Sequence, residues 1–253
     1  MTTPESVIAL YEECRDYRQM HRDIYGGDEY TDQLDFWTRT EIKEFGRLLR
    51  LDHNSSMLDV GCGLGGPACL LARTFNAKVM GIDLSEWHIS ESRAAAARLG
   101  LGDQINFSVF DARSFDGGGM QFDAVVAIDS IVYMHPLGIL FHGLRRLLKP
   151  TARMLLASEC FDHKALANVL HAREKAGAMK CIVDKELQAD LTESGFRIES
   201  ISRDYERRRR FAKQALQWMD LHKQHAGREN MTAILNACET GGAFEVLIVA
   251  QAR

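Results

Sequence analysis

The feature that most restricts the possible folds is a regular alternation of short apolar runs and helix-type segments in the middle of the chain. The apolar runs are bounded by Gly or Asp and are typical of buried strands: Met57–Val60, Lys78–Ile82, Ile105–Phe110, Phe122–Ile128 and Arg153–Ala157. The segments between them carry apolar residues at helical spacing: Pro67–Phe75, Glu86–Leu99 and Leu137–Leu148. Repeated strand–helix–strand units predict a parallel sheet covered by helices on both faces.

The two flanks of this region depart from the alternation. The elements expected there are helices over Pro4–Ile24, Asp32–Arg50 and Asp184–Ser194, a turn over Tyr25–Tyr30, a strand over Phe196–Ser202, a polar helical insertion over Asp204–Thr240 and a last strand over Ala243–Gln251. Because the last strand is reached without a crossover, we expect it to lie antiparallel at the end of the sheet.

The length of 253 residues is enough for one full core with additions. The expected organisation is an N-terminal helical lid (residues 1–50), an α/β core (51–203), a helical cap insertion (204–240) and the final strand of the core (241–253). No apolar run approaches the ~20 residues of a membrane span. The first ten residues lack a basic stretch followed by an apolar one, so no secretory signal is expected.

Charge and cysteine usage narrow the functional classes. The net charge of −4 argues against nucleic-acid binding, which usually needs a basic face. The six cysteines are scattered and form no C-x-x-C pair, so neither a zinc site nor a disulfide framework is expected. A cytoplasmic location fits this pattern.

The most specific motif is LDVGCGLGG (residues 58–66), in which a strand runs into a glycine-rich turn that opens a helix. Glycines are needed there because the turn takes φ values closed to other residues and because a ligand lies against the backbone. Gly61, Gly63 and Gly66 also satisfy G-x-G-x-x-G, so an NAD-dependent oxidoreductase is one alternative.

Three acidic strand ends favour a different cofactor. Asp59 precedes the first glycine, where a carboxylate would repel a pyrophosphate but attract a cation. Asp83 ends the second strand, where a carboxylate accepts hydrogen bonds from both ribose hydroxyls. Asp111, followed by Ala112, ends the third strand and can bind the adenine edge. Together they predict a site for S-adenosylmethionine, whereas the plainer interpretation makes all three helix caps or turn residues.

Residues 57–159 resemble the class I S-adenosylmethionine-dependent methyltransferases, most closely the small-molecule enzymes of the quinone, sterol, phosphoethanolamine and sugar O-methyltransferase type. The matching motifs are LDVGCGLGGPACLLA, VMGIDLS, FDAR, FDAVVAIDSI and the RRLLKP-to-strand transition, in that order. The resemblance implies a Rossmann-like, seven-stranded α/β sheet, mostly parallel with an antiparallel last strand, with helices on both faces and a helical cap. It implies methyl transfer from S-adenosylmethionine to an O, N or C atom of a small-molecule metabolite.

The resemblance also implies roles for individual residues at the cofactor. These are Gly61 and Gly63 against the methionyl part with Asp59 nearby, the backbone carbonyl of Ile128 near the methionyl ammonium, Asp83 on the ribose, Leu84 packed on adenine, Asp111 and Ala112 at the adenine edge, and His88 where the group often has a Gln.

Catalytic candidates follow from the sugar O-methyltransferase branch, in which a His follows the fourth strand and an acidic residue ends the fifth. Here the His position holds Val132 or Tyr133, and His135 comes slightly later. Glu159 matches the acidic position. The catalytic candidates are therefore Glu159, Tyr133 and His135, and no metal site is predicted. The plainer interpretation makes Tyr133 a packing aromatic and His135 the beginning of the next helix.

Other uses of the same fold stay open at this point. One is an enzyme that binds S-adenosylmethionine but performs a cyclisation or lyase reaction, and another is a non-catalytic cofactor-binding module. The run Arg207–Arg210 is interpreted as a solvated face rather than a grip on an acidic substrate. Tyr25, Tyr30, Phe36 and Trp37 could close over the cofactor or simply pack. The expected partner is a small-molecule substrate, with no nucleic acid or membrane, as a monomer or homodimer.

Overall fold

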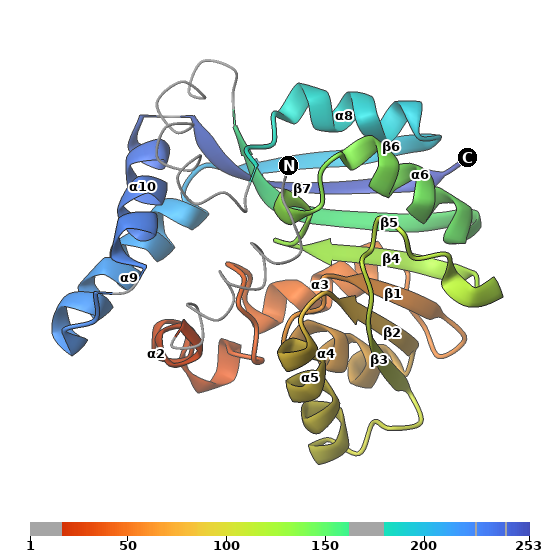
Figure 1. Ribbon diagram of the computed structural model, residues 1–253, viewed down its shortest axis with the longest axis horizontal. Coiled ribbons are helices and arrows are strands. Elements are labelled where there is room, and N and C mark those ends of the chain that lie inside the picture. The colour runs from red at the N-terminus through yellow and green to blue at the C-terminus, as the bar shows by residue number, and fades with distance from the viewer. Residues whose placement is uncertain (1–16, 162–179, 226, 241) are drawn as a thin grey trace.

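A seven-stranded sheet with the order β3-β2-β1-β4-β5-β7-β6 organises the chain (Figure 1). The computed structural model describes residues 17–161, 180–225, 227–240 and 242–253. The strands are β1 (Ser56–Val60), β2 (Lys78–Asp83), β3 (Ile105–Val109), β4 (Phe122–Ile128), β5 (Leu148–Phe161), β6 (Phe196–Asp204) and β7 (Ala243–Ala252). The helices are α2 (Tyr17–Glu29), α3 (Arg39–Leu48), α4 (Gly66–Phe75), α5 (Glu86–Arg98), α6 (Leu137–Leu147), α8 (Asp184–Glu193), α9 (Arg207–His222) and α10 (Arg228–Glu239), with short 3₁₀ turns η1 (Gly117–Gly119) and η2 (Ile131–Tyr133).

The pairing of the strands confirms the predicted sheet. β1 pairs in parallel with β2 and β4, and parallel pairs also join β2 to β3 and β4 to β5. β7 is antiparallel to both of its neighbours, β5 and β6. The last strand therefore lies inside the sheet rather than at its edge, because β6 leads through the cap helices α9 and α10 directly back into the adjacent β7.

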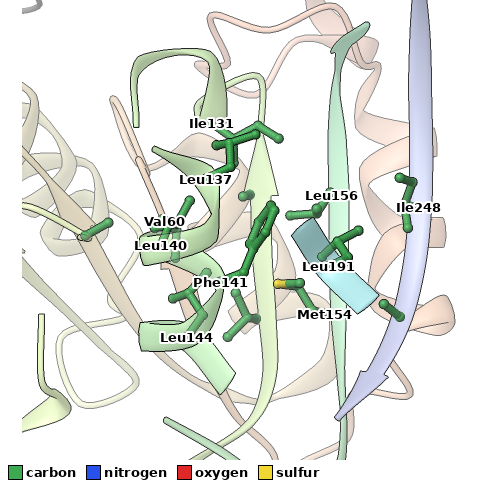
Figure 2. Close-up of a cluster of buried hydrophobic side chains, with 14 of the residues drawn as sticks. Val60, Ile131, Leu137, Leu140, Phe141, Leu144, Met154, Leu156, Leu191 and Ile248 are labelled. Atoms are coloured by element: carbon green, nitrogen blue, oxygen red, sulfur yellow. The ribbon is translucent and has the colours of Figure 1, made fainter. Parts of the chain in front are cut away.

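Helices cover both faces of the sheet, each over its own apolar core. On one face, α6 and α8 pack on the sheet, and Figure 2 shows the Phe141 ring of α6 beside Met154 and Leu156 of β5. On the other face, α3, α4 and α5 pack together against the sheet. Figure 1 shows α2, α9 and α10 gathered beyond one end of the strands. They share a third apolar cluster, which includes Met20, Phe211 and Met231.

The N-terminal helices differ from the prediction in their bounds. The helix expected over Asp32–Arg50 begins only at Arg39, because Thr38 and Glu41 form a capping box that fixes its start. Trp37 and Phe45 are buried with the core, so α3 packs on the core rather than in a lid. The turn expected over Tyr25–Tyr30 is instead a kink at Gly26, where φ is +71°, and α2 continues to Glu29. The part of the helix expected over Pro4–Ile24 that precedes Tyr17 lies outside the described residues.

Gly81 in β2 provides a test of how tightly the core is packed. A Cβ at this position would lie 2.5 Å from the ring of Phe107, which is buried in β3. We expect Gly81→Ala to lower the free energy of unfolding by about 1–3 kcal/mol, since overpacking forces neighbours to shift. Gly102→Ala is the matched control, because a Cβ there meets nothing within 4 Å. Thermal unfolding that shows the same melting temperature for both variants would contradict this account of the packing.

Candidate cofactor and substrate site

A cavity that is open to solvent lies where β1, β2, β4 and β5 end at their carboxyl termini. Open α/β sheets bind their ligands at this edge. The loop before α3 and residues of α2, α9 and α10 line its other sides. Of the residues predicted from the sequence, the lining contains Asp59, Gly61, Gly63, Asp83, His88, Ile128, Tyr133 and Glu159.

The glycine-rich turn forms one wall of the cavity. Gly61 has a φ of +72°, and a Cβ there would lie 2.4 Å from the Cβ of Ser130. Its glycine is therefore required by the protein's own packing, whatever ligand is bound. Gly63 differs, because a Cβ built on it meets nothing within 4 Å and the residue lines the cavity. The absence of a side chain at Gly63 leaves room for a ligand against the backbone.

Asp83 connects this turn to the next strand. One carboxylate oxygen accepts a hydrogen bond from the Gly63 backbone N–H at 2.9 Å, and the other accepts one from the Ser85 N–H at 2.9 Å. The Nδ1 atom of His88 lies 3.3 Å from the second oxygen, and both side chains are almost fully buried. The carboxylate is thus held in one orientation at the end of β2.

Asp59 is a buried carboxylate with one oxygen, Oδ2, that makes no hydrogen bond to the described residues. Burial, together with the charge of Asp83, raises the pKa of Asp59 to about 7. A buried carboxylate without a full set of partners is costly, and a cationic ligand would offset that cost. The site therefore fits a ligand that brings positive charge to Asp59.

The residues predicted to contact adenine lie outside the lining of this cavity. Leu84, Asp111 and Ala112 are not among the residues that line the cavity. The carboxylate of Asp111 accepts hydrogen bonds from Arg113, at 3.0 Å for Nε and 2.6 Å for Nη2. This pairing lowers the pKa of Asp111.

The three catalytic candidates divide between two cavities. Tyr133 and Glu159 line the site at the strand ends. His135 instead lines a second cavity between α6 and α8, so the structure does not bring it to the other two. The 3₁₀ turn η2 ends at Tyr133 and carries the chain away from the strand ends before His135. Burial lowers the pKa of His135 to about 4, as does the charge of Lys180.

The arginine run is a correction to the sequence interpretation. Arg207 and Arg208 are not solvated, since their side chains are only 12% and 6% exposed. Arg207 donates to both carboxylate oxygens of Glu41, at 2.8 and 2.5 Å, and lies over the Trp37 ring. These contacts join the beginning of α9 to the beginning of α3, and Arg208 is the member of the run that lines the cavity.

Several residues of the site were missed by the sequence reasoning. Arg208 and Asp129 line the cavity, as do Tyr17 and His21 from α2. His21 is buried with its Nδ1 atom 2.9 Å from the Tyr17 carbonyl oxygen, and burial lowers its pKa to about 4. A histidine on a polar helix and an aspartate after a strand carry no local signal for this placement.

Of the four aromatic residues of the N-terminal segment that could close over a cofactor, one lines the cavity. Phe36 lines the cavity, whereas Trp37 is buried in the core against Phe45. Tyr25 donates a hydrogen bond to the Asp35 carbonyl oxygen at 3.2 Å. Tyr25 and Tyr30 do not line the cavity.

Comparisons with known proteins agree with this geometry. A family model described as a methyltransferase domain matches residues 57–151. The O-methyltransferase resE of Aspergillus sclerotiorum is 27% identical over 210 residues, which cover 78% of this chain and 77% of that protein. Phosphoethanolamine N-methyltransferase 3 of Arabidopsis thaliana is 34% identical over 122 residues, covering 48% of this chain and 24% of that protein.

Solved structures share the fold over most of the chain. The cyclopropane synthase MmaA2 from Mycobacterium tuberculosis has a TM-score of 0.82 at 14% identity, and the match covers 99% of both chains. The geranyl diphosphate C-methyltransferase from Streptomyces coelicolor, solved with S-adenosyl-L-homocysteine, has a TM-score of 0.70 at 17% identity, covering 85% of this chain and 79% of that chain.

The sheet, the glycine-rich turn and the matching relatives define a class I S-adenosylmethionine-dependent methyltransferase. Within that class the chain belongs to the methyltransferases that act on small molecules, and its cofactor is S-adenosylmethionine. The cyclase, lyase and non-catalytic alternatives are not favoured by these relatives. In the part of the chain that the structure describes, no helix is both long enough and apolar enough to cross a bilayer.

Proposed function

We propose that this enzyme methylates a hydroxyl oxygen. The proposal rests on the share of this chain that the match to each relative covers. The N-methyltransferase match covers 48% of the chain and a sterol 24-C-methyltransferase match covers 37%. The match to the O-methyltransferase resE extends over 210 residues, more than the core (51–203) and the final strand (241–253) together contain, so it includes part of the lid or the cap. Those segments line the substrate side of the cavity.

We assign the cofactor half of the cavity as the sequence predicted it. Asp83 would hold the ribose hydroxyls, with His88 beside it. Gly61 and Gly63 would lie along the methionyl part, and Asp59 and the Ile128 carbonyl near its ammonium. Leu84, Asp111 and Ala112 would bind adenine. The open space beside the Gly63 backbone and the Asp59 oxygen that makes no hydrogen bond to the described residues support this assignment.

When bound, S-adenosylmethionine supplies a methyl group already activated by a sulfonium. The remaining task of the protein is to align the acceptor with that methyl group and to exclude water. A hydroxyl acceptor also has a proton to lose. We assign Glu159 to accept this proton, because its carboxylate is buried, lines the cavity and lies two residues before the end of β5. Tyr133 would orient the hydroxyl from the end of the neighbouring parallel strand β4.

The affinity for S-adenosylmethionine should depend on pH through Asp59. Its pKa is about 7 in the cofactor-free protein, and a cation nearby favours the ionised form. Binding should therefore release a proton below neutral pH, and affinity should fall by up to about tenfold per pH unit as the pH drops below 7. Calorimetric titration across pH measures this slope. Asp59→Asn should bind more weakly but with a flat profile, and an equally steep profile in the variant would exclude Asp59.

Product analysis tests the proposed function itself. The full chain is incubated with methyl-labelled S-adenosylmethionine and a small-molecule extract of its source cells. We expect S-adenosylhomocysteine to form one-for-one with a labelled methyl ether, identified by mass spectrometry. Product formation without S-adenosylhomocysteine would mean a cyclisation or lyase reaction, and label on carbon or nitrogen would disprove O-methylation.

We also propose the domain organisation and location expected from the sequence. Within the N-terminal region (1–50), α2 and the loop before α3 would cover the substrate together with the cap (204–240), whereas α3 packs on the core. The core (51–203) with the final strand (241–253) would hold the cofactor and supply Tyr133 and Glu159. A cytoplasmic location is supported by the buried thiols of Cys62, Cys69 and Cys160, none of which forms a disulfide.

A further inference from the structure

The substrate side of the cavity contains one arginine, Arg208, and no other Arg or Lys among the described residues that line it. Arg208 lies in the first turn of α9 and its side chain is 6% exposed. A buried guanidinium facing a cavity would ordinarily suit a phosphate or carboxylate of a substrate. Whether it can do so depends on what its donors already bind.

The donors of Arg208 are engaged by carboxylates of the protein itself. Nε donates to Oε2 of Glu245 at 2.6 Å, and Nη2 donates to Oδ1 of Asp129 at 2.5 Å. Nη1 lies 3.7 Å from Oε1 of Glu159. The guanidinium also lies over the Phe36 ring, 4.2 Å from its centroid. Its edges and one face are therefore covered.

The charge of this cluster is negative rather than positive. Three carboxyl groups surround one guanidinium, and Glu159 and Glu245 are direct cross-strand partners of β5 and β7. Burial, together with the charge of Asp129 and a hydrogen bond to it, raises the pKa of Glu245 well above its usual range. With a proton shared between Asp129 and Glu245, one carboxylate still remains in excess over the arginine.

The other described groups on this side add acceptors and apolar surface, not cations. Asp35 is a further buried carboxylate in the lining. Leu34, Met231 and Ile234 supply apolar wall. An anionic substrate would meet negative charge here without a cation to neutralise it. A hydroxyl group on an apolar body would instead donate to the acceptors and bury its body.

We infer that the methyl acceptor is an uncharged or cationic, mainly apolar molecule. The enzyme rejects anionic acceptors because the carboxylates of Asp129, Glu159 and Glu245 surround the Arg208 guanidinium, which is then not available to bind an anion. The inference rests on the proposed function for the reaction, but its binding test does not need turnover. It predicts that relieving Arg208 of its partners converts the pocket into an anion site.

The binding test uses phenyl phosphate as the probe and the full chain saturated with S-adenosylhomocysteine. We expect no saturable binding to the wild type by calorimetry. The double variant D129N/E245Q leaves Arg208 with two neutral amide acceptors and one distant carboxylate, Glu159. It should bind the probe saturably, at least about tenfold tighter than the weakest binding that the titration can detect. The D129N change suits the left-handed backbone at this residue, where φ is +50°. Adding R208Q should remove the gained binding.

Glu206→Gln is the matched control, since Glu206 pairs with the exposed Arg209 of the same helix. It should bind the probe no better than the wild type. Wild-type binding of phenyl phosphate that is lost in R208Q would overturn the inference. A correctly folded double variant, checked by circular dichroism, that gains no binding would also overturn it; where the double variant does not fold, D129N alone is judged by the same criterion.

A second arm tests acceptors directly. The small-molecule extract is separated by anion exchange, and each fraction is incubated with labelled cofactor. Label in the unretained, non-anionic fraction is expected, and label confined to the retained fraction would overturn the inference. Label in neither fraction would count against the proposed function, while the binding test would still decide the inference.

Discussion

Replacing Glu159 by glutamine is expected to slow the chemical step by about 10²–10⁴-fold, the usual contribution of a general base. The cofactor affinity should change little, because Glu159 lies on β5, which is separated in the sheet by β4 from β1 and its glycine-rich turn. Single-turnover rates separate the chemical step from binding, and titration with S-adenosylhomocysteine measures the cofactor site. Wild-type rates should also fall at low pH as the base becomes protonated, and this acidic limb should disappear in the variant.

Tyr133→Phe separates positioning from proton transfer. If Tyr133 only orients the hydroxyl, its loss should raise KM more than it lowers kcat and should leave the acidic limb intact.

Glu206→Gln is the control for Glu159→Gln, because it also removes a carboxylate, but from an exposed position on the cap. A Glu159→Gln enzyme with full turnover and an unchanged pH profile would defeat the assignment, leaving alignment and water exclusion as the source of catalysis.

For Asp83→Asn, we expect at least a tenfold loss of affinity for S-adenosylmethionine. Two effects combine. The hydrogen bonds that we propose between the carboxylate and the ribose hydroxyls would weaken, each worth roughly 1.5–3 kcal/mol. In addition, of the backbone N–H groups of Gly63 and Ser85, one loses its acceptor and the other keeps only a neutral amide oxygen. Calorimetry measures the affinity, and circular dichroism checks the fold.

Asp123→Asn is the matched control for this substitution. Asp123 also accepts a backbone hydrogen bond, from Ser56 N–H at 2.9 Å, but it lies at the beginning of β4, the opposite end from the site. It should leave cofactor affinity unchanged while costing some stability. An Asp83→Asn protein that binds the cofactor as tightly as the wild type would remove Asp83 from the ribose site.

The place of Gly61, Gly63 and Asp83 at the edge of the cavity could be predicted because its signals are local. The strand, turn and helix that present Gly61 and Gly63 are contiguous in sequence. Asp83 follows from the parallel sheet, since the pairing of Val60 with Ile82 places the end of β2 beside the beginning of the turn. The geometry of such a motif is fixed by residues that are neighbours in the sequence or on paired strands.

The substrate half could not be predicted because its contacts are distant in sequence. Arg208 meets Asp129 and Glu245 across 79 and 37 residues. A run of arginines at the start of a polar helix usually means solvent, and only the tertiary fold buries its first two members. One signal was available: Glu245 interrupts the apolar run of β7, and a buried carboxylate requires a partner. His135 was predicted as a catalytic candidate but lines the other cavity. Its sequence position gave no indication that the chain leaves the first cavity after η2.

The antiparallel pairing of β6 with β7 has a consequence for how such an enzyme could be diversified. The cap leaves the sheet after Asp204 and returns at Ala243, and Asp204 is the register partner of Glu245. Both ends of the insertion therefore emerge side by side from neighbouring strands. A segment of different length or sequence could be spliced between them at little cost in loop entropy, without moving any strand that carries the cofactor turn. The cap could therefore be replaced by another segment while the sheet stays unchanged. The replacement would need an arginine in the first turn of α9, because this arginine neutralises the buried carboxylates of the sheet.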